Sequence, residues 1–253
     1  MQFVSYSYSL PYVGFILFMI LLAFWEFINI NLKRGNYWIR VITISSFLLF
    51  FGFRGFVGRD IFNYYDLFKA LPTIWDWNSK TFSSYSYIEI GYRVYVTLIK
   101  SISTNFSFFI FISVLIDAII LDITFKRYSK YYVLSFILYI IMYGHVFEME
   151  QLRNCKSIML FLLSLPYLEN KKFVPYLILN LIGLSFHSTS LIFIIAYFFL
   201  IREFSIYFYL TVFIVGNLLF LFKVEYIQSL FNFFGVFLDD GIVGKVNRYF
   251  NLS

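Results

Sequence analysis

Charged residues are scarce in this chain. Asp, Glu, Lys and Arg make up 13% of its 253 residues, against roughly 25% in an average soluble domain. Hydrophobic residues make up 61%, with 36 Phe and 22 Tyr among the aromatic and apolar side chains. Such a chain cannot cover its folded core with polar surface. The shortage of charge therefore excludes an ordinary soluble domain and predicts an integral membrane protein.

Cysteine and histidine are almost absent. The one cysteine, Cys155, excludes an internal disulfide and a cysteine-based metal cluster, and the two histidines stand far apart. The sequence also lacks a Walker loop, an H-E-x-x-H pair and a G-x-S-x-G elbow. We therefore expect no metal and no cofactor. Membrane topology accounts for the net charge of +6, so we expect no nucleic acid partner.

Apolar runs long enough to form membrane helices recur along the chain. The predicted spans are Pro11–Ile30, Val41–Val57, Phe106–Phe125, Tyr131–Phe147, Ser157–Leu168, a hairpin of two spans in Phe173–Leu200, and Phe204–Phe222. The first run is a retained helix, because no positive charge precedes it and no small-residue cleavage site follows it. The sequence predicts one all-α membrane domain, residues 1–253, with about eight transmembrane helices.

The longest polar section, Gly58–Asn105, reads as a long outer loop. Within it, Tyr87–Ile102 has apolar residues at helical spacing but carries three charges, which predicts an interfacial helix and not a span. The basic loops at Lys33–Arg40, Lys126–Lys130, Lys171–Lys172 and Arg202 then all face the cytoplasm, with both termini outside. Two acids lie within predicted spans. We expect Glu26 to snorkel to the interface and Asp117 to be buried and protonated.

This topology gathers polar residues from separate parts of the chain on the outer face. They are Arg54, Arg59, Asp60, Asp66, Glu89, Arg93, His145, Glu148, Glu150, Arg153 and His187. Ionisable residues at membrane depth are costly and usually mark a site. The stretch FGFRGFVGRDIFNYYDLF, residues 51–68, sets arginines beside a carboxylate on glycine-rich backbone, which suits an anionic lipid headgroup. An interfacial loop with a charged rim is the alternative.

Individual residues leave further alternatives open. His187 is either a helix-end histidine bonded to a serine or the backbone, or a general base or diphosphate ligand. Arg153 either pairs locally with Glu148 and Glu150 or clamps an anion. Glu89 either pairs with Arg93 one turn on or serves the site.

Four segments together resemble a known family. They are GFVGRDIFNYY, EIGYRVYVTLI, MEQLRNCKSIMLFLLSL and LIGLSFHSTSLIF, and their order and spacing resemble the EpsG family, which is related to the Wzy-type polymerases of O-antigen, capsule and exopolysaccharide. The family pattern falls on Arg54, Gly58, Asp60, Tyr64, Glu89, Gly91, Tyr92, Arg153 and His187. Asn154 stands where the family usually has Gln. The chain also ends earlier than most members, which leaves open a truncated chain or a short variant.

The resemblance implies a GT-C-like glycosyltransferase of the bacterial cytoplasmic (inner) membrane, without metal or cofactor. It would transfer a glycan from undecaprenyl diphosphate to a lipid-linked repeat unit on the outer face. Arg54 and Arg153, with Arg59 as a secondary candidate outside the family pattern, would stabilise the leaving diphosphate. The general base would be Asp60, Glu89 or His187.

Tyr64 and Tyr92 would also contact the substrate. Implied partners are membrane lipid and the flippase and chain-length regulator of the same pathway. Two other functions stay open. One is a transporter or flippase of lipid-linked glycans, and the other is a membrane acyltransferase that modifies surface sugars.

Overall fold

The computed structural model describes residues 10–31, 37–202 and 204–221, and its regular elements in these ranges are helices. They are α1 Leu10–Asn31, α2 Tyr37–Gly52, α3 Ile61–Ala70, α4 Ser79–Ser83, α5 Ile90–Ile102, α6 Phe106–Tyr128, α7 Tyr132–Tyr139, η2 Ile140–Gly144, α8 His145–Met149, α9 Leu152–Glu169, α10 Phe173–Phe186, α11 Ser190–Leu200 and α12 Ile206–Leu221. The predicted cytoplasmic residues Lys33 and Arg34, and the predicted end of the last span at Phe222, lie outside the described residues.

Three segments are long and apolar enough to cross a membrane, namely Leu10–Asn29, Phe106–Tyr128 and Tyr132–Met149. The helices α2, α10 and α11 and the segment Ile206–Asn217 are shorter and also apolar. Large apolar side chains face outward along these helices, as Phe24 does at 64% and Ile192 at 66% exposure. Outward-facing apolar surface of this extent suits lipid and not water. The expectation of an all-α membrane protein is therefore confirmed.

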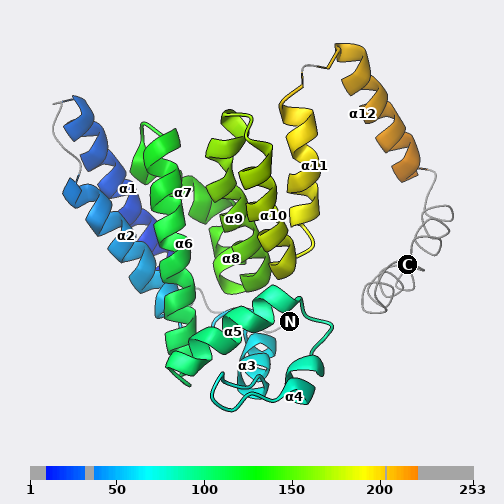
Figure 1. Cartoon of the computed structure of the whole chain (residues 1–253). Coiled ribbons are helices and arrows are strands. Elements are labelled where there is room, and N and C mark those ends of the chain that lie inside the picture. Colours follow the sequence, from blue (N-terminus) through cyan, green and yellow to red (C-terminus); the bar gives the residue numbers. More distant parts are fainter. Residues whose placement is uncertain (1–9, 32–36, 203, 222–253) are drawn as a thin grey trace.

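The helices form a bundle around α6. Helix α6 packs against α2, α7 and α9, while α1 covers α2 and α7. On the other side α9 packs against α10, and α10 against α11. The fully buried Phe47, Leu121 and Phe136 fill the centre between α2, α6 and α7. Helix α12 stands apart from the bundle beyond α11 (Figure 1).

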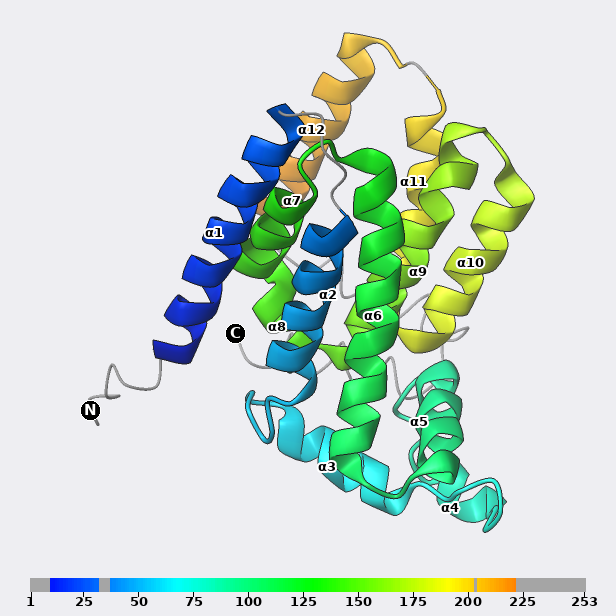
Figure 2. The same cartoon turned by 90° about the vertical axis from the view of Figure 1, so that its left-hand side faces the viewer.

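Helices α3, α4 and α5 lie together at one end of the bundle, below α6 and α10 in Figures 1 and 2. We call these three helices and their connections, residues 53–105, the cap. Helix α5 contacts both α6 and α10, and α3 contacts α5. The predicted interfacial helix is therefore present, beginning at Ile90 and not at Tyr87. Most of the predicted site residues lie in the cap, and the other two, Arg153 and His187, lie at the start of α9 and the end of α10.

Two predicted features differ in the structure. Helix α2 ends at Gly52 and not at Val57, because the backbone turns through left-handed conformations at Gly55 (φ 67°) and Gly58 (φ 118°). Glu26 does not snorkel. It is 2% exposed, and its carboxylate accepts hydrogen bonds of 2.9 Å from the backbone N–H groups of Tyr132 and Val133. Glu26 therefore caps the first turn of α7, where backbone N–H groups lack partners within the helix.

Candidate active site

A polar cavity of about 480 Å³ lies between the cap and the start of α9. Its lining residues are Asp60, Asn63, Tyr64, Asp66, Leu67, Tyr85, Tyr87, Ile88 and Arg153. We call this cavity the outer pocket. It brings together Asp60, Tyr64 and Arg153, which the sequence proposed as site residues from two distant segments. Its volume lies within the range of small-molecule sites in proteins.

One wall of the outer pocket is a single face of α3. Asp60, Asn63, Tyr64 and Leu67 follow the i, i+3, i+4, i+7 spacing that places side chains on one side of a helix. Asp60 immediately precedes α3, but its side chain does not cap the helix. The Asn63 amide donates a long hydrogen bond of 3.5 Å to Oδ1 of Asp60. The carboxylate oxygens of Asp60 therefore remain available to a ligand in the pocket.

Gly58 explains how the chain reaches this position. Its φ of 118° is a conformation that residues with a side chain rarely adopt. A Cβ on Gly58 would also lie 2.6 Å from the carbonyl oxygen of Met149, at the end of α8. The glycine lets the loop pass against α8 before α3 begins, and this places Asp60 beside the start of α9.

Arg153 and Glu89 form an ion pair, with Nη1 of Arg153 2.5 Å from Oε2 of Glu89. The pair is partly open to solvent, with 24% and 17% of the two side chains exposed. The Arg153–Glu89 pair stands in place of the local pairs considered from the sequence, which were Glu89 with Arg93 and Arg153 with Glu148 and Glu150. Arg93, the alternative partner of Glu89, instead donates to the carbonyl of Phe82 at 2.7 Å and lies over the Phe82 ring. The partner of Arg153 is thus a residue 64 positions away, not Glu148 or Glu150.

Gly91, two residues after Glu89, sets how closely the start of α5 packs against α10. A Cβ on Gly91 would overlap the hydroxyl and the backbone carbonyl of Ser185, so α5 approaches α10 as closely as only glycine allows. Tyr92 next to it is fully buried, and its ring packs edge-on against Tyr64 at 5.9 Å. A tyrosine hydroxyl is protonated at neutral pH, and burial raises the pKa of the Tyr64 hydroxyl further. Tyr64 can therefore donate a proton in a hydrogen bond to a ligand.

Arg54 lies deeper than the outer pocket. All three guanidinium nitrogens are buried and have no hydrogen-bond partner among the described residues. Burial lowers the pKa of Arg54, while the negative charge of Glu148 acts in the opposite direction. An arginine side chain nevertheless stays protonated in a protein. A buried cation that lacks acceptors is costly, so this guanidinium is suited to receive an anion or ordered water.

The remaining predicted residues lie outside the outer pocket as the structure describes it. Arg59 is exposed and is not among the lining residues. His187 is half-buried, with Nδ1 3.2 Å from the Thr189 hydroxyl, which in turn donates to Oδ1 of Asn154 at 2.7 Å. The hydroxyl and backbone contacts expected of a helix-end histidine are present. This chain links His187 to the residue next to Arg153, so it can support α9 without touching a ligand in the pocket.

A second group of charged residues lies inside the bundle. Lys156 of α9 pairs with Asp117 of α6 and donates to the carbonyl of Ser113 at 2.9 Å. Glu148 accepts a 2.8 Å hydrogen bond from the Tyr139 hydroxyl. We call Asp117, Tyr139, Glu148, Cys155 and Lys156 the buried cluster. Asp117 is buried, as the sequence predicted, and Lys156 supplies a positive charge beside it that the sequence did not indicate. The sequence placed Lys156 in a turn that extends the span Ser157–Leu168, whereas α9 is helical from Leu152 and carries Lys156 into the bundle.

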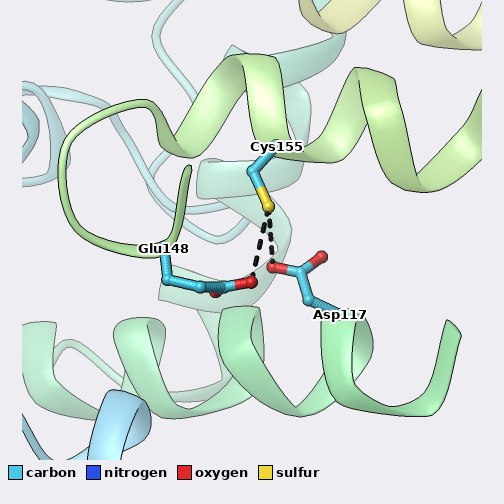
Figure 3. A group of neighbouring side chains, drawn as sticks. All are labelled: Asp117, Glu148 and Cys155. Atoms are coloured by element: carbon cyan, nitrogen blue, oxygen red, sulfur yellow. Dashed lines mark hydrogen bonds between the residues drawn. The ribbon is translucent and has the colours of Figure 1, made fainter. Parts of the chain in front are cut away.

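Cys155 joins the two acids of this cluster. Its thiol lies 3.6 Å from both Asp117 and Glu148, and the three side chains point toward one another from α6, α8 and α9 (Figure 3). Their donor atoms lie within 4.8 Å of one another, close enough to hold a metal ion. The ammonium group of Lys156 already binds Asp117, however, and its charge disfavours a second cation there. The arrangement therefore fits a group of buried charges balanced by Lys156 better than a metal centre.

Comparison with known proteins adds the identity of the family. No curated protein and no solved structure matches this chain. The model of the EpsG family matches residues 37–253, which include the cap, the outer pocket and the buried cluster. The chain therefore belongs to the EpsG family, a family of Wzy-like polysaccharide polymerases.

Proposed function

We propose that this protein polymerises a bacterial surface polysaccharide by transferring a glycan from undecaprenyl diphosphate to a lipid-linked repeat unit. The observation that carries the proposal is the outer pocket, where an arginine, a carboxylate and tyrosines meet at one end of an apolar bundle. A lipid-linked sugar diphosphate suits this arrangement. Its lipid can lie against the apolar bundle, and its diphosphate and sugar can bind the cation and the polar groups of the outer pocket. Family membership supports the same reaction class.

The membrane arrangement follows from this proposal. The single domain lies in the cytoplasmic membrane with about eight crossings, and the cap faces the outer side, where repeat units arrive after a flippase has moved them. The turns between α6 and α7 and between α9 and α10 carry Lys130 and Lys171 and lie at the end of the bundle opposite the cap (Figure 1). The proposed orientation puts both lysines on the cytoplasmic side, in agreement with the positive-inside rule. A chain-length regulator of the same pathway is the further expected partner.

Arg153 and Arg54 bind the diphosphate in the proposed reaction. Arg153 exchanges Glu89 for a phosphate oxygen, since a guanidinium binds carboxylate and phosphate with the same planar set of donors. Arg54 offers donors that lack acceptors among the described residues. Tyr92 lies within electrostatic reach of both arginines, which supports a single anion site between them. They stabilise the negative charge that grows on the leaving diphosphate.

Asp60 is the proposed general base, because its carboxylate lines the outer pocket and does not cap α3. It removes the proton of the acceptor hydroxyl while the hydroxyl oxygen bonds to the anomeric carbon of the donor glycan. The bond from that carbon to the diphosphate oxygen breaks, and its electron pair leaves with the lipid diphosphate. Glu89 holds Arg153 in position until the diphosphate replaces it, and His187 positions α9 through Thr189 and Asn154. The reaction uses no metal or cofactor.

A gel of surface polysaccharide from a strain that lacks the gene tests the proposal. We expect long chains to disappear while chains of a single repeat unit remain. Unchanged chain length would refute polymerase activity. Loss of all surface chains would instead favour a flippase, the alternative for which the buried Asp117–Lys156 pair at membrane depth is the supporting observation. Complementation with the wild-type gene and with Asp60→Asn then tests the assigned base.

A further inference from the structure

We propose that the outer pocket selects an uncharged sugar residue, and that Asp66, Tyr85 and Tyr87 form this sugar subsite. The inference rests on the proposed polymerase function and names the class of sugar that meets the new linkage. These three residues line the same cavity as Asp60 and Arg153. They extend the reacting end of the pocket toward the surface of the cap.

The two tyrosines supply flat surfaces of the kind that bind sugar rings. Tyr85 and Tyr87 lie between α4 and α5, with ring centroids 5.9 Å apart and planes inclined by 46°. Tyr85 is half-buried and Tyr87 is 55% exposed, so the pair is held by the cap while its outer ring remains accessible. An aromatic ring can pack against the C–H face of a sugar, and its hydroxyl can bond at the edge.

The opposite wall supplies polar groups that match hydroxyls. Asp60, Asn63 and Asp66 come from α3 and the residue before it, and all three side chains are exposed. A carboxylate accepts hydrogen bonds and does not donate them when ionised, and the Asn63 amide does both. Sugar hydroxyls donate and accept, so this wall fits a neutral sugar that presents hydroxyl or N-acetyl groups.

The charge of the pocket disfavours an acidic sugar. Arg153 is its one lining cation among the described residues, and the diphosphate takes this cation in the proposed reaction, where Glu89 pairs with it at 2.5 Å in the structure. Neither Asp60 nor Asp66 has an ion-pair partner in the described structure. The neighbouring Lys69 lies over the Tyr65 ring at 4.1 Å and does not line the cavity. A uronic acid would therefore bring a third negative charge beside two unbalanced carboxylates, and such repulsion is a common source of specificity.

The diphosphate and the sugar thus use different parts of the site. The diphosphate belongs at the arginine end, where Arg153 and the deeper Arg54 provide positive charge. The sugar belongs between α3 and the tyrosine wall, where the free charges are negative. This division lets one cavity hold an anionic leaving group while it rejects anionic sugars.

Chemical analysis of the polysaccharide that disappears in the deletion strain tests the inference. We expect the two sugar residues that flank the polymerised linkage to carry no carboxylate, sulfate or phosphate. An acidic residue at either position would overturn the sugar selection and leave the polymerase function intact. A deletion strain with unchanged chains would instead refute the polymerase function itself, so the two failures are distinguishable.

A variant gives the second measurement. Full-length protein in proteoliposomes is supplied with lipid-linked repeat unit extracted from the deletion strain. Asp66→Asn removes a charged acceptor and should slow polymer formation by about tenfold, the loss expected for one hydrogen bond to a charged group. Binding of undecaprenyl diphosphate, used as the probe of the arginine end, should not change. Asp76→Asn, on the same cap but outside the pocket, is the matched control. An unchanged rate for Asp66→Asn, or equal losses for both variants, would exclude Asp66 from the subsite.

Discussion

Helix α9 contributes Arg153 to the outer pocket and Lys156, three residues later, to the buried cluster. The two cations differ in how far their ion pairs are exposed. Arg153 pairs with Glu89 at the edge of a cavity, and the pair is partly exposed. Lys156 is 4% exposed, and Asp117 and the Ser113 carbonyl accept from it inside the bundle. A substrate can replace Glu89 at the first cation but cannot reach the second. One turn of helix thus separates charges suited to bind a ligand from charges suited to hold helices together.

The largest effect on folding should come from Lys156→Ala. The change leaves the Asp117 carboxylate buried without its cation, which typically destabilises a protein by about 3–5 kcal/mol. A lower unfolding temperature of the detergent-solubilised protein, followed by size-exclusion chromatography of a fluorescent fusion, would show the loss.

The double variant Asp117→Leu with Lys156→Met provides the control for that measurement. Replacement of a whole buried pair by apolar side chains is often neutral, so it should recover much of the lost stability. A Lys156→Ala protein as stable as the wild type would mean that the buried cluster does not hold α6 and α9 together.

The largest effect on activity should come from Arg153→Ala. Loss of one donor to the developing charge of a leaving group typically lowers a rate by about 10²–10³. The partly exposed partner Glu89 can be hydrated, so the unfolding temperature should fall less than in Lys156→Ala. Polymer formation in proteoliposomes and the thermal assay measure the two quantities on the same preparation.

Arg153→Lys separates charge from shape at this position. Lysine keeps the positive charge but lacks the planar pair of donors that matches a phosphate. We expect activity between those of the wild type and Arg153→Ala. Wild-type polymer ladders from Arg153→Ala would remove this residue from the site.

Gly58→Ala tests the loop between α2 and α3. This loop leads to Asp60 of the outer pocket and packs against Met149 at the end of α8, the helix that carries Glu148 of the buried cluster. The new Cβ would meet the Met149 carbonyl at 2.6 Å and require an unfavourable φ. Strained backbone of this kind costs about 1–3 kcal/mol, and the shift of Asp60 should also lower activity.

Gly55→Ala is the matched control for the clash. Gly55 also has a positive φ, 67°, but nothing lies within 4 Å of its Cβ position. It should retain more activity than Gly58→Ala, since it carries backbone strain without the clash. Equal losses in the two variants would assign the effect to backbone conformation alone.

The sequence predicted the outer pocket better than the buried cluster, for physical reasons. The family pattern brought Asp60 and Tyr64 together in one short stretch, and the topology placed Glu89 and Arg153 on the same outer face. The apolar runs likewise located the membrane helices, although the end of α2 depended on glycine conformations that hydropathy does not report.

Partners inside the bundle were not predictable in this way. Asp117 and Lys156 are 39 residues apart on different helices, and their contact depends on how α6 rotates against α9. Glu26 was misassigned for the same reason, since its hydrogen-bond donors are backbone N–H groups of α7 that a composition pattern cannot locate. Asp66 was named among the outer-face residues, but Asn63 of α3 was missed, and Tyr85 and Tyr87 were not named as site residues because the segment between α4 and α5 has no regular periodicity. The stripe on α3 could have identified Asn63.

The smallest effect should come from Arg127→Ala, at the end of the bundle opposite the cap. Arg127 pairs with Glu169 at 3.0 Å, and 48% of each side chain is exposed. An exposed pair of this kind contributes about 0–1 kcal/mol, because water solvates both ions once they separate. We expect an unchanged polymer ladder and a thermal shift near the error of the measurement. The variant is therefore the surface counterpart of Arg153→Ala, with the same residue type and an ion pair again broken, but far from the outer pocket. A marked loss of polymer in Arg127→Ala would show that function is not confined to the cap end, and the contrast between ligand-binding and structural charges on α9 would then have to be redrawn.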